Sequence, residues 1–403
     1  WYRLDENGEV QYDDPITADE SALPVDPSSD PAPGFDNSRR GVPGGFVGDP
    51  DVMDTWATSS LTPQIASGWG EDEELFAKTF PMDLRPQGHD IIRTWLFSTV
   101  LRSQLEHGTL PWANAAITGF IYDPERKKMS KSKGNAVTPM GLLEEYGADG
   151  FRYWATSVRP GMDAAFDVGQ MKVGRRLAIK VLNVSKFVLS RLGEDGSGAA
   201  TADHPLDRSL LAGLAEVASA ATAAFEAYDF ARALERTESF FWSFCDDYVE
   251  LVKARAYGSA ADPGTASARA TLSLTLSVLL RLLAPFLPYV TEEVWSWWQQ
   301  GSIHRADWPD AAELAAAAGD GDPAVLGTAA AVLARVRKAK TEAARSLRAP
   351  VDRVTVTAGE QQLDRLRQAG DDLRQAGSVA VLDLVGGGGD EVAVEVELAA
   401  EAS

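Results

Sequence analysis

The sequence predicts an α/β segment followed by an all-α segment and a small α/β tail. Short apolar runs alternate with helical segments over residues 51–168, which is the pattern of a doubly wound α/β sheet. Long Ala- and Leu-rich segments with helical periodicity follow one another over residues 169–310, as in a helical bundle. Helical and strand-like runs alternate again over residues 324–403. These three observations predict the order of the domains.

The composition is that of a globular protein and narrows the classes of function. The chain has 403 residues, of which 45% are hydrophobic, enough for two or three domains with a sizeable core. Its apolar runs near residues 272–283 are interrupted by Ser, Thr and Arg, so no membrane span is predicted. The formal net charge of −21 argues against nonspecific nucleic-acid binding by the whole surface. No secretory signal is present, and a cytoplasmic location is expected.

The cysteine and histidine content speaks against metal binding. The single cysteine, Cys245, excludes a disulfide framework and a multi-cysteine zinc site. It lies in an apolar run, and we interpret it as a small buried hydrophobic side chain. The four histidines are scattered without metal-ligand spacing, so no protein-bound metal is predicted. The sequence opens at Trp1 without a methionine, and we expect the protein to extend on the N-terminal side.

The first segment, residues 1–50, is rich in Pro, Asp and Gly and is predicted as an irregular surface connection. One hairpin is expected within residues 1–12. Residues 90–105 show helical periodicity, and residues 138–139 cap a second helix that Gly147 is expected to end. The apolar stripe of the first helix consists of Ile92, Leu96 and Val100, with Ile91 and Trp95 beside it.

The bundle and the tail follow from the same periodicity. Pro285 and Pro288 should break the last bundle helix. An acidic, Ala-rich linker is predicted near residues 310–323. The expected bundle helices are 170–192, 206–227, 229–258 and 265–299. The expected tail elements are helix 325–345, strand 351–357, helix 360–375, and strands 379–385 and 391–398.

The most informative segment is residues 126–135, which read RKKMSKSKGN. Five cations fall within eight residues, with two serines and a glycine near them. Lysine ammonium groups suit phosphate oxygens, and serine hydroxyls and glycine-freed backbone amides can donate to the same anion. Taken alone, such a run is more often a solvated basic patch. An apolar run before it and a helix start after it favour an ordered loop that binds a polyanion.

Residues 128–132, KMSKS, resemble the second signature of class I aminoacyl-tRNA synthetases, which grips the ATP triphosphate. The resemblance extends over most of the chain, and its details are those of the valyl-tRNA synthetases. The other matching segments are 51–60 (DVMDTWATSS, a substrate-pocket strand), 85–95 (RPQGHDIIRTW, the turn that closes the adenylate site), 145–154 after the signature loop, and 240–257 and 284–295 of the anticodon-binding bundle.

This resemblance implies the fold of each domain. Residues 51–168 would form the second half of a class I, Rossmann-like catalytic domain that contains the KMSKS loop. Residues 169–310 would form a helical anticodon-binding domain, and residues 324–403 a small α+β C-terminal domain.

The resemblance also implies an activity, namely ATP-dependent formation of valyl-adenylate and transfer of valine to tRNA(Val). Lys128 and Lys131 would neutralise the pyrophosphate leaving group. ATP with Mg²⁺ is expected as a substrate, and a monomer that does not bind membranes is expected. Further ATP contacts would come from Ser130, Ser132, Gly88, His89 and Asp90. The amino-acid pocket would be lined by Trp56, Ile91 and Trp95.

Each assignment has an alternative. Asp90 can accept hydrogen bonds from the ATP ribose, or it can cap the helix that follows. Aromatic side chains at helical spacing are more often core than pocket. Two further basic groups resemble solvated helix faces more than tRNA-binding surfaces. These groups are Lys172, Arg175, Arg176, Lys180 and Lys186, and Arg335, Arg337, Lys338, Lys340, Arg345 and Arg348.

Two other functions stay open at this point. Residues 56–60, WATSS, match neither the FVDSS typical of leucine enzymes nor the WFDSG typical of isoleucine enzymes, although an isoleucine enzyme is the nearest alternative. The sequence holds neither a His-Ile-Gly-His-type first signature nor an editing insert, both of which precede this region in the family. We therefore expect the isolated 403-residue chain to be inactive, and a tRNA-binding fragment without catalysis is the second alternative.

Overall fold

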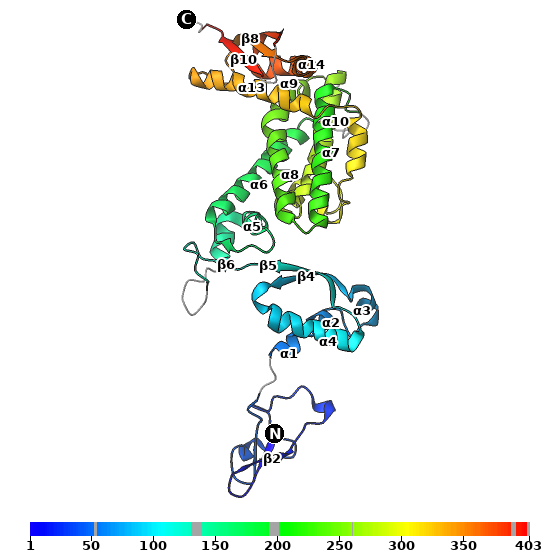
Figure 1. Cartoon of the computed structure of the whole chain (residues 1–403), viewed down its shortest axis with the longest axis vertical. Coiled ribbons are helices and arrows are strands. Elements are labelled where there is room, and N and C mark those ends of the chain that lie inside the picture. The colour runs from blue at the N-terminus through cyan, green and yellow to red at the C-terminus, as the bar shows by residue number, and fades with distance from the viewer. Residues whose placement is uncertain (52–54, 130–138, 193–200, 260, 388–391, 401–403) are drawn as a thin grey trace. The chain divides into compact units, whose positions relative to one another are not determined.

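The computed structural model describes residues 1–51, 55–129, 139–192, 201–259, 261–387 and 392–400 (Figure 1). The chain divides into two compact units, Trp1–Ala116 and Ile117–Ser403.

The first unit begins with a small sheet. Strands β1 (Tyr2–Leu4) and β2 (Val10–Pro15) pair antiparallel, which confirms the predicted hairpin. Strand β3 (Phe46–Val47) pairs with the other edge of β1. Trp1, Ala32 and Phe46 form the apolar cluster beneath it. Two short 3₁₀ turns, Glu20–Ala22 and Asn37–Arg39, lie in the otherwise irregular connection.

The rest of the first unit alternates helices and strands. Strands β4 and β5 form a two-stranded sheet, so the described residues supply only part of the doubly wound sheet that the alternation predicts. The elements are α1 (Thr55–Ser59), α2 (Thr62–Ala66), α3 (Glu73–Thr79), β4 (Met82–Gly88), the 3₁₀ turn η3 (His89–Ile91), the π-helical turn η4 (Ile92–Leu96), α4 (Phe97–His107) and β5 (Trp112–Thr118).

The helix predicted over residues 90–105 is confirmed, but its buried face is not the predicted one. The turn η4 is π-helical, and a π turn inserts an extra residue that changes the phase of an α-helical stripe. Ile92 is therefore 39% exposed, whereas Trp95 is 3% exposed. Thr99 and Ser103 are buried on the same side as Trp95. The stripe through Ile92 was wrong for this reason.

The second unit begins with the segment around the basic loop. Strands β6 (Ile121–Tyr122) and β7 (Ala164–Ala165) pair in parallel. Helix α5 (Met140–Thr156) follows the loop. Gly147 interrupts α5 with φ of 75°, a conformation that favours glycine. Gly147 is the non-helical residue at which the first helical stretch of α5 ends, as predicted, and a second stretch begins directly after this kink. Thr138 lies outside the described residues.

A helical bundle forms most of the second unit (Figure 1). Helix α10 ends before Pro285 and α11 begins at Pro288, as predicted from these prolines. The predicted helix 229–258 contains a π turn, η6. The elements are α6 (Val168–Leu189), α7 (Pro205–Glu226), α8 (Phe230–Ser243), η6 (Phe244–Tyr248), α9 (Val249–Ala256), α10 (Pro263–Leu283), α11 (Pro288–Ser296) and the 3₁₀ turn η7 (Ile303–Arg305).

Helix α10 is the core helix of this bundle. Among the described helices it is the one long and apolar enough to cross a membrane by length and composition, but 61% of its most apolar 18-residue window is buried inside the fold. Burial of this kind is expected of a core helix in a large bundle. Leu272, Leu279 and Leu283 are among its fully covered side chains.

The predicted linker near residues 310–323 was wrong in its first half. Residues Ala311–Ala318 form helix α12, which contacts α7. Alanine has the highest helix propensity, and the Asp310 carboxylate accepts from the Ala312 backbone N–H at 2.7 Å as an N-cap. The Ala-rich composition therefore specified a helix.

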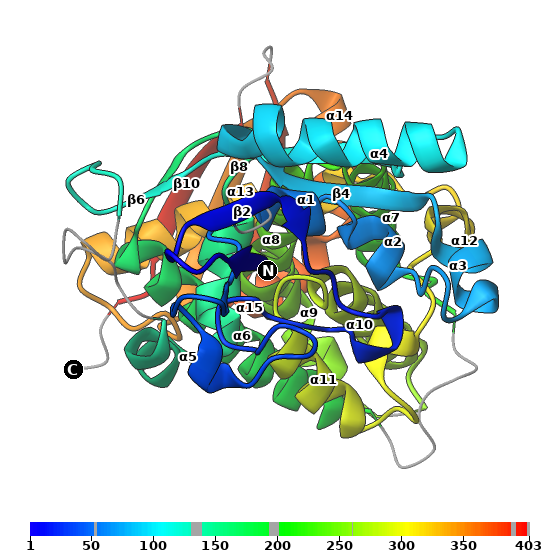
Figure 2. The ribbon, with the colours of Figure 1, turned by 90° about the horizontal axis from the view of Figure 1, so that it is seen from below.

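The tail is a three-stranded sheet with helices beside it (Figures 1 and 2). The strand order is β10-β8-β9, with β8 and β9 parallel and β10 antiparallel to β8. The predicted elements are confirmed, except that the helix predicted over residues 360–375 is divided at Ala369 into two. The elements are α13 (Ala324–Glu342), β8 (Val351–Ala358), α14 (Glu360–Gln368), α15 (Gly370–Gly377), β9 (Val379–Gly386) and β10 (Ala393–Leu398).

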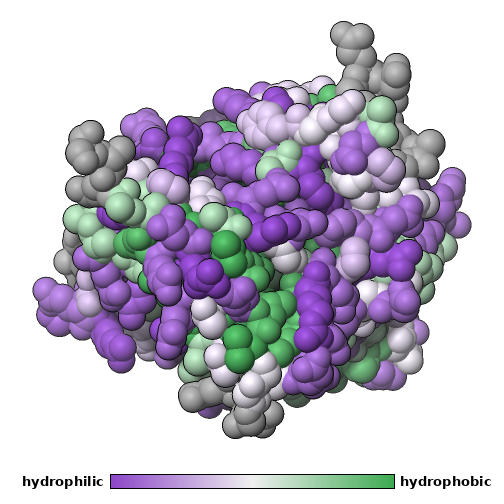
Figure 3. All heavy atoms as spheres, turned by 90° about the horizontal axis from the view of Figure 1, so that it is seen from above, coloured by the Kyte–Doolittle hydropathy of each residue, from purple (hydrophilic) through white to green (hydrophobic). Residues whose placement is uncertain are grey.

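Bundle and tail share one hydrophobic core. The cluster that contains Leu210 of α7 and Leu279 of α10 continues through Val332 of α13 to Val354 of β8. The tail is therefore packed on the bundle and is not a loosely tethered module. The face of the molecule in Figure 3 is mostly hydrophilic, with a smaller apolar area on it, in line with the large negative net charge.

Candidate functional site

Lys128 lies at the end of a tight turn that begins in β6. Tyr122 and Lys128 form an antiparallel bridge. The Asp123 carboxylate accepts from the Lys127 backbone N–H at 2.7 Å, and the Asp123 N–H donates to the Lys127 carbonyl at 2.9 Å. These bonds fix the chain that leads into the basic loop. The Lys128 ammonium group lies 4.1 Å from the centre of the Phe120 ring, a cation–π contact. Lys131, Ser130 and Ser132 lie outside the described residues.

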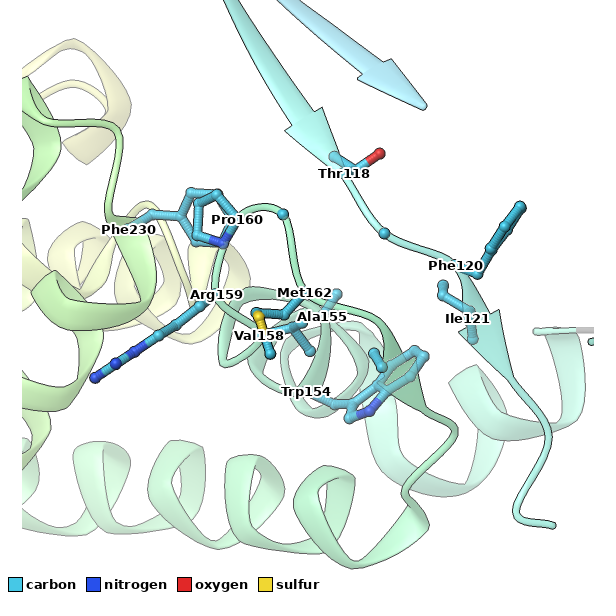
Figure 4. Close-up of a pocket in the computed structure, with 13 residues that line it drawn as sticks. Thr118, Phe120, Ile121, Trp154, Ala155, Val158, Arg159, Pro160, Met162 and Phe230 are labelled. Carbon is cyan, nitrogen blue, oxygen red and sulfur yellow. The ribbon is translucent and has the colours of Figure 1, made fainter. Parts of the chain in front are cut away.

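A mostly apolar cavity of about 240 Å³ lies beside this turn (Figure 4). Trp154, Val158 and Met162 lie near one another there, and the Phe120 ring points away from them (Figure 4). Arg159 is the only ionisable side chain among the described residues that line it. The cavity therefore offers no carboxylate or imidazole for acid–base chemistry.

Gly88, His89 and Asp90 stand where β4 passes into η3. A Cβ atom at Gly88 would lie 3.0 Å from a carboxylate oxygen of Asp90, so the absence of a side chain lets that carboxylate approach the backbone. Asp90 is exposed. It does not cap η3 or η4, whose N-cap residues are Gly88 and Ile91 and have no side-chain cap bond. The interpretation of Asp90 as a helix cap is therefore wrong, and its carboxylate faces solvent.

The three predicted pocket residues come from two neighbouring segments. Trp56 on α1 is 36% exposed and Trp95 on η4 is 3% exposed. Ile91 is half-buried at the end of η3. The Trp95 indole N–H donates to the Ser59 carbonyl at 2.8 Å, which joins η4 to the end of α1. The structure thus brings the segment of Trp56 against the segment of Ile91 and Trp95.

Helix α5, which follows the basic loop, is bonded to the bundle at a junction that the sequence did not reveal. The Asp149 carboxylate accepts from the backbone N–H groups of Tyr289 at 3.1 Å and Val290 at 2.8 Å, in the first turn of α11. Arg152 donates to the Pro285 carbonyl at 2.9 Å. Burial raises the pKa of Asp149 in spite of the two N–H donors, which lower it. A carboxylate at the positive end of a helix dipole is a favourable arrangement.

We expect Asp149→Ala to destabilise the fold by about 2 kcal/mol, because two backbone N–H groups lose their acceptor. Asp149→Asn keeps one acceptor and should recover part of the loss. Since burial raises the pKa of Asp149, the folded state holds its proton more tightly than the unfolded state does, and this proton-linked part of the stability is present at low pH and is lost as the pH rises through the raised pKa. The wild type should therefore lose stability relative to Asp149→Asn over that pH range.

Urea unfolding at several pH values measures both effects of Asp149. Asp352→Ala is the matched control, because Asp352 is exposed on β8 and should change the midpoint little. An unchanged midpoint in Asp149→Ala would contradict the assignment of Asp149 as the acceptor that holds α5 to α11.

A second unpredicted cluster joins the bundle to the tail. The Arg255 guanidinium on α9 bonds Asp207 of α7 and Asp372 of α15, each at 2.7 Å in its shortest contact. Asp207 is fully buried, and it also accepts from Tyr248 at 2.9 Å and Ser267 at 2.6 Å. Burial raises the pKa of Asp372. Burial lowers the pKa of Arg255, but its hydrogen bonds to the two carboxylates outweigh this effect and raise the pKa.

The two basic groups on helices differ in exposure. On α6, Lys172, Arg176 and Lys186 are exposed, whereas Lys180 bonds Asp246 at 2.8 Å. In the basic group on α13, one lysine is buried and bonds the tail. Lys340 is 1% exposed and donates to the carbonyls of Leu347 and Gly377, which are residues of the tail. Its interpretation as part of a solvated face is wrong, because its ammonium serves as a buried donor.

Cys245 is 5% exposed, and burial raises the pKa of its thiol to about 12, which confirms its interpretation as a buried hydrophobic side chain. Over the part of the chain that the structure describes, no three His, Cys, Asp or Glu side chains lie close enough to hold a metal ion.

Comparison with known proteins relates these features to a family. Residues 35–167 match the family of tRNA synthetases class I (I, L, M and V), and residues 207–356 match the anticodon-binding domain of tRNA ligase. The valine–tRNA ligase of Thermobifida fusca is 62% identical over 400 residues, which are 99% of this chain and 45% of the relative. The valine–tRNA ligase of Salinispora tropica is 56% identical over 400 residues, 95% of this chain and 46% of the relative.

A solved structure supports the fold. The LeuRS of Agrobacterium radiobacter K84, crystallised as a ternary complex with tRNA and LeuAMS, superposes with a TM-score of 0.56 at 23% identity over 67% of this chain and 35% of that chain. The chain spans about 45% of the length of the curated relatives that it matches. The resemblance inferred from the KMSKS segment and its neighbours is confirmed: the chain is similar to valine–tRNA ligases over nearly its whole length, and two of its segments match class I tRNA synthetases and the anticodon-binding domain of tRNA ligase.

Proposed function

We propose that the protein containing this chain is an ATP-dependent ligase that activates valine and transfers it to tRNA(Val). The observation that carries the proposal is the 62% identity to a valine–tRNA ligase over 99% of the chain, which favours valine over isoleucine as the substrate. In such a reaction the valine carboxylate attacks the α-phosphate of ATP, and pyrophosphate leaves with its Mg²⁺. No covalent enzyme intermediate is needed, so the protein positions the reactants and stabilises charge.

The basic loop would supply that charge stabilisation. Lys131 carries the main role, aided by the hydroxyl groups of Ser130 and Ser132. Lys128 would have to leave the ring of Phe120, where its ammonium group now lies at 4.1 Å. A cation–π contact of an exposed lysine is worth about 0.5–1 kcal/mol, so a triphosphate with several negative charges can displace it.

The turn after β4 would receive the nucleoside of ATP. The carboxylate of Asp90 is exposed and does not cap a helix, so it is available as an acceptor for ribose hydroxyl groups. Gly88 lets the Asp90 carboxylate lie close to the backbone, and His89 is exposed next to it. This arrangement supports the assignment of all three to the ATP site.

The amino-acid pocket gives the test of valine specificity. We expect Trp56→Ala to raise the activation of isoleucine relative to valine by about tenfold or more, because removal of an indole opens space for an added methylene. Threonine, a near-isostere of valine, should be activated by both forms. Poor rejection of threonine is a general property of a valyl-tRNA synthetase pocket, because an apolar pocket cannot strongly reject an isostere that adds a hydroxyl group.

The measurement for Trp56 is pyrophosphate exchange with valine, isoleucine and threonine, using the full-length enzyme. Trp69→Ala is a matched control, since Trp69 in the same unit is also exposed, at 42%. If Trp56→Ala uses isoleucine as poorly as the wild type does, Trp56 is outside the pocket. Absence of valine-dependent exchange in the wild-type enzyme would refute the proposed function itself.

The exposed basic face of α6 supports contact with tRNA. Lys172, Arg176 and Lys186 recur at helical spacing on one side of the helix. At the end of α6, the Arg191 guanidinium lies 4.1 Å from the centre of the Tyr257 ring, and Tyr257 is 57% exposed. Cations can bind phosphate groups, and an exposed aromatic ring beside them can stack on an unstacked base. The chain has a net charge of −21. The basic face of α6 would therefore attract tRNA to its own side of the bundle.

We expect Arg176→Glu to weaken tRNA binding about tenfold or more and to reduce the dependence of affinity on salt, because one phosphate contact becomes a repulsion. Lys338→Glu makes the same change in charge on α13, where Lys338 is exposed near Glu342, and should have little effect. Filter binding over a series of salt concentrations measures both. Equal losses in the two variants would show that only net charge matters and would exclude α6 as the tRNA-binding face.

A further inference from the structure

The environment of Trp95 is unusual for a core tryptophan. Arg85 of β4 places the carbon of its guanidinium 4.1 Å from the centre of the Trp95 ring. Trp112 of β5 stacks on Trp95, with ring centres 5.9 Å apart and planes inclined by 10°. The Trp95 N–H donates to the Ser59 carbonyl at 2.8 Å. The indole is thus held by contacts from two strands and by a hydrogen bond to the end of α1.

The contact with Arg85 is not one that a surface arginine would make by chance. Burial lowers the pKa of Arg85, and its Nε atom is buried without a hydrogen-bond partner. Among the described residues, no carboxylate forms an ion pair with Arg85. A guanidinium group normally obtains acceptors for its five donors. Here it gives up part of that hydrogen bonding and lies on an aromatic face, where the flat cation is attracted by the ring.

These contacts leave Trp95 with little freedom. A tryptophan on a helical turn can rotate about two side-chain torsions, but the stack and the hydrogen bond to Ser59 together specify one orientation. A pocket that separates valine from isoleucine distinguishes a single methylene. A side chain that forms a wall of such a pocket has to be held within a fraction of an ångström. This requires supporting residues that fix the rotamer of that side chain.

We propose that Arg85 and Trp112 are positioning residues that hold the Trp95 indole as a rigid wall of the amino-acid pocket, and so set side-chain selectivity without touching the amino acid. This inference rests on the proposed function and on the assignment of Trp95 to that pocket, which the resemblance to the synthetases implies. Neither Arg85 nor Trp112 is among the residues that the sequence assigned to the site.

The test compares selectivity in variants of the full-length enzyme. Arg85→Met removes the planar cation and keeps much of its length, and Trp112→Leu removes the stacked ring. Each should lower the ratio of kcat/KM for valine to that for isoleucine about tenfold, with the change for valine mainly in KM. Arg85→Lys and Trp112→Phe keep a cation or a ring and should restore part of the ratio. Arg102→Met, on α4, is the matched control and should keep the wild-type ratio.

Trp95→Ala separates this inference from the proposed function on which it rests. If Trp95→Ala leaves the ratio unchanged, the assignment of Trp95 to the pocket is refuted. If Trp95→Ala lowers the ratio but Arg85→Met and Trp112→Leu keep it, the positioning role is refuted and these residues only pack. A lower thermal midpoint with an unchanged ratio is also evidence against positioning. Should the first pair of variants fail to fold, Arg85→Lys and Trp112→Phe decide by the same ratio.

Discussion

Replacement of Lys131 with alanine should lower valine-dependent pyrophosphate exchange at least a hundredfold in the full-length enzyme, or about 2.7 kcal/mol of transition-state stabilisation. The reason is that pyrophosphate gains negative charge as it leaves, and the second lysine of the KMSKS segment is placed by the sequence to neutralise it. Valine binding should change little, because the ground state carries less of this charge. Lys131 itself lies outside the described residues, so the expectation rests on the sequence.

The chain provides a matched control for Lys131. Lys127 belongs to the same basic run, but its ammonium group bonds Glu125 at 2.6 Å, and Lys127→Ala should reduce exchange only slightly. Lys128→Ala should have an intermediate effect. Near-normal exchange in Lys131→Ala would refute the role of Lys131, whereas equal losses in Lys127→Ala and Lys131→Ala would show that the loop acts only through its overall charge.

A second large effect is expected at the junction of bundle and tail. Arg255→Met should destabilise the second unit by about 3–5 kcal/mol, because it leaves two buried carboxylates without their cation. Asp207 is fully buried and Asp372 is 2% exposed, so water cannot replace the lost guanidinium. Replacing the charged groups together with apolar side chains should cost much less, since a buried ion pair is often no more stable than well-packed hydrophobic residues.

Urea unfolding followed by circular dichroism measures this loss. Lys253→Met is the control on the same helix, because Lys253 is exposed and its contact with Glu250 at 3.2 Å is a surface ion pair. Such pairs contribute at most about 1 kcal/mol. A free energy of unfolding for Arg255→Met within 1 kcal/mol of the wild type would contradict the structural role of the cluster.

The order of elements could be predicted because it depends on local patterns. Apolar periodicity located the bundle helices, prolines located the break between α10 and α11, and alternation located the tail strands. The errors also have local causes. An Ala-rich segment was taken for a linker although alanine favours helix, and the π turn at residues 92–96 moved the buried face of its helix. The segment of the KMSKS loop was recognised from sequence alone, and the assignment of the pocket residues stays a prediction.

What the sequence determined by itself is the order of most helices and strands and which family motifs are present. What only the tertiary structure decided is the partner of each ionisable side chain. Arg255 meets Asp372 across 117 residues and Asp149 meets Val290 across 141 residues. A charge on a helix gives no sign in the sequence of whether it faces water or a distant partner, because periodicity records that a face is buried but not what covers it. The folded chain fixes those pairs through packing of elements that are far apart in sequence.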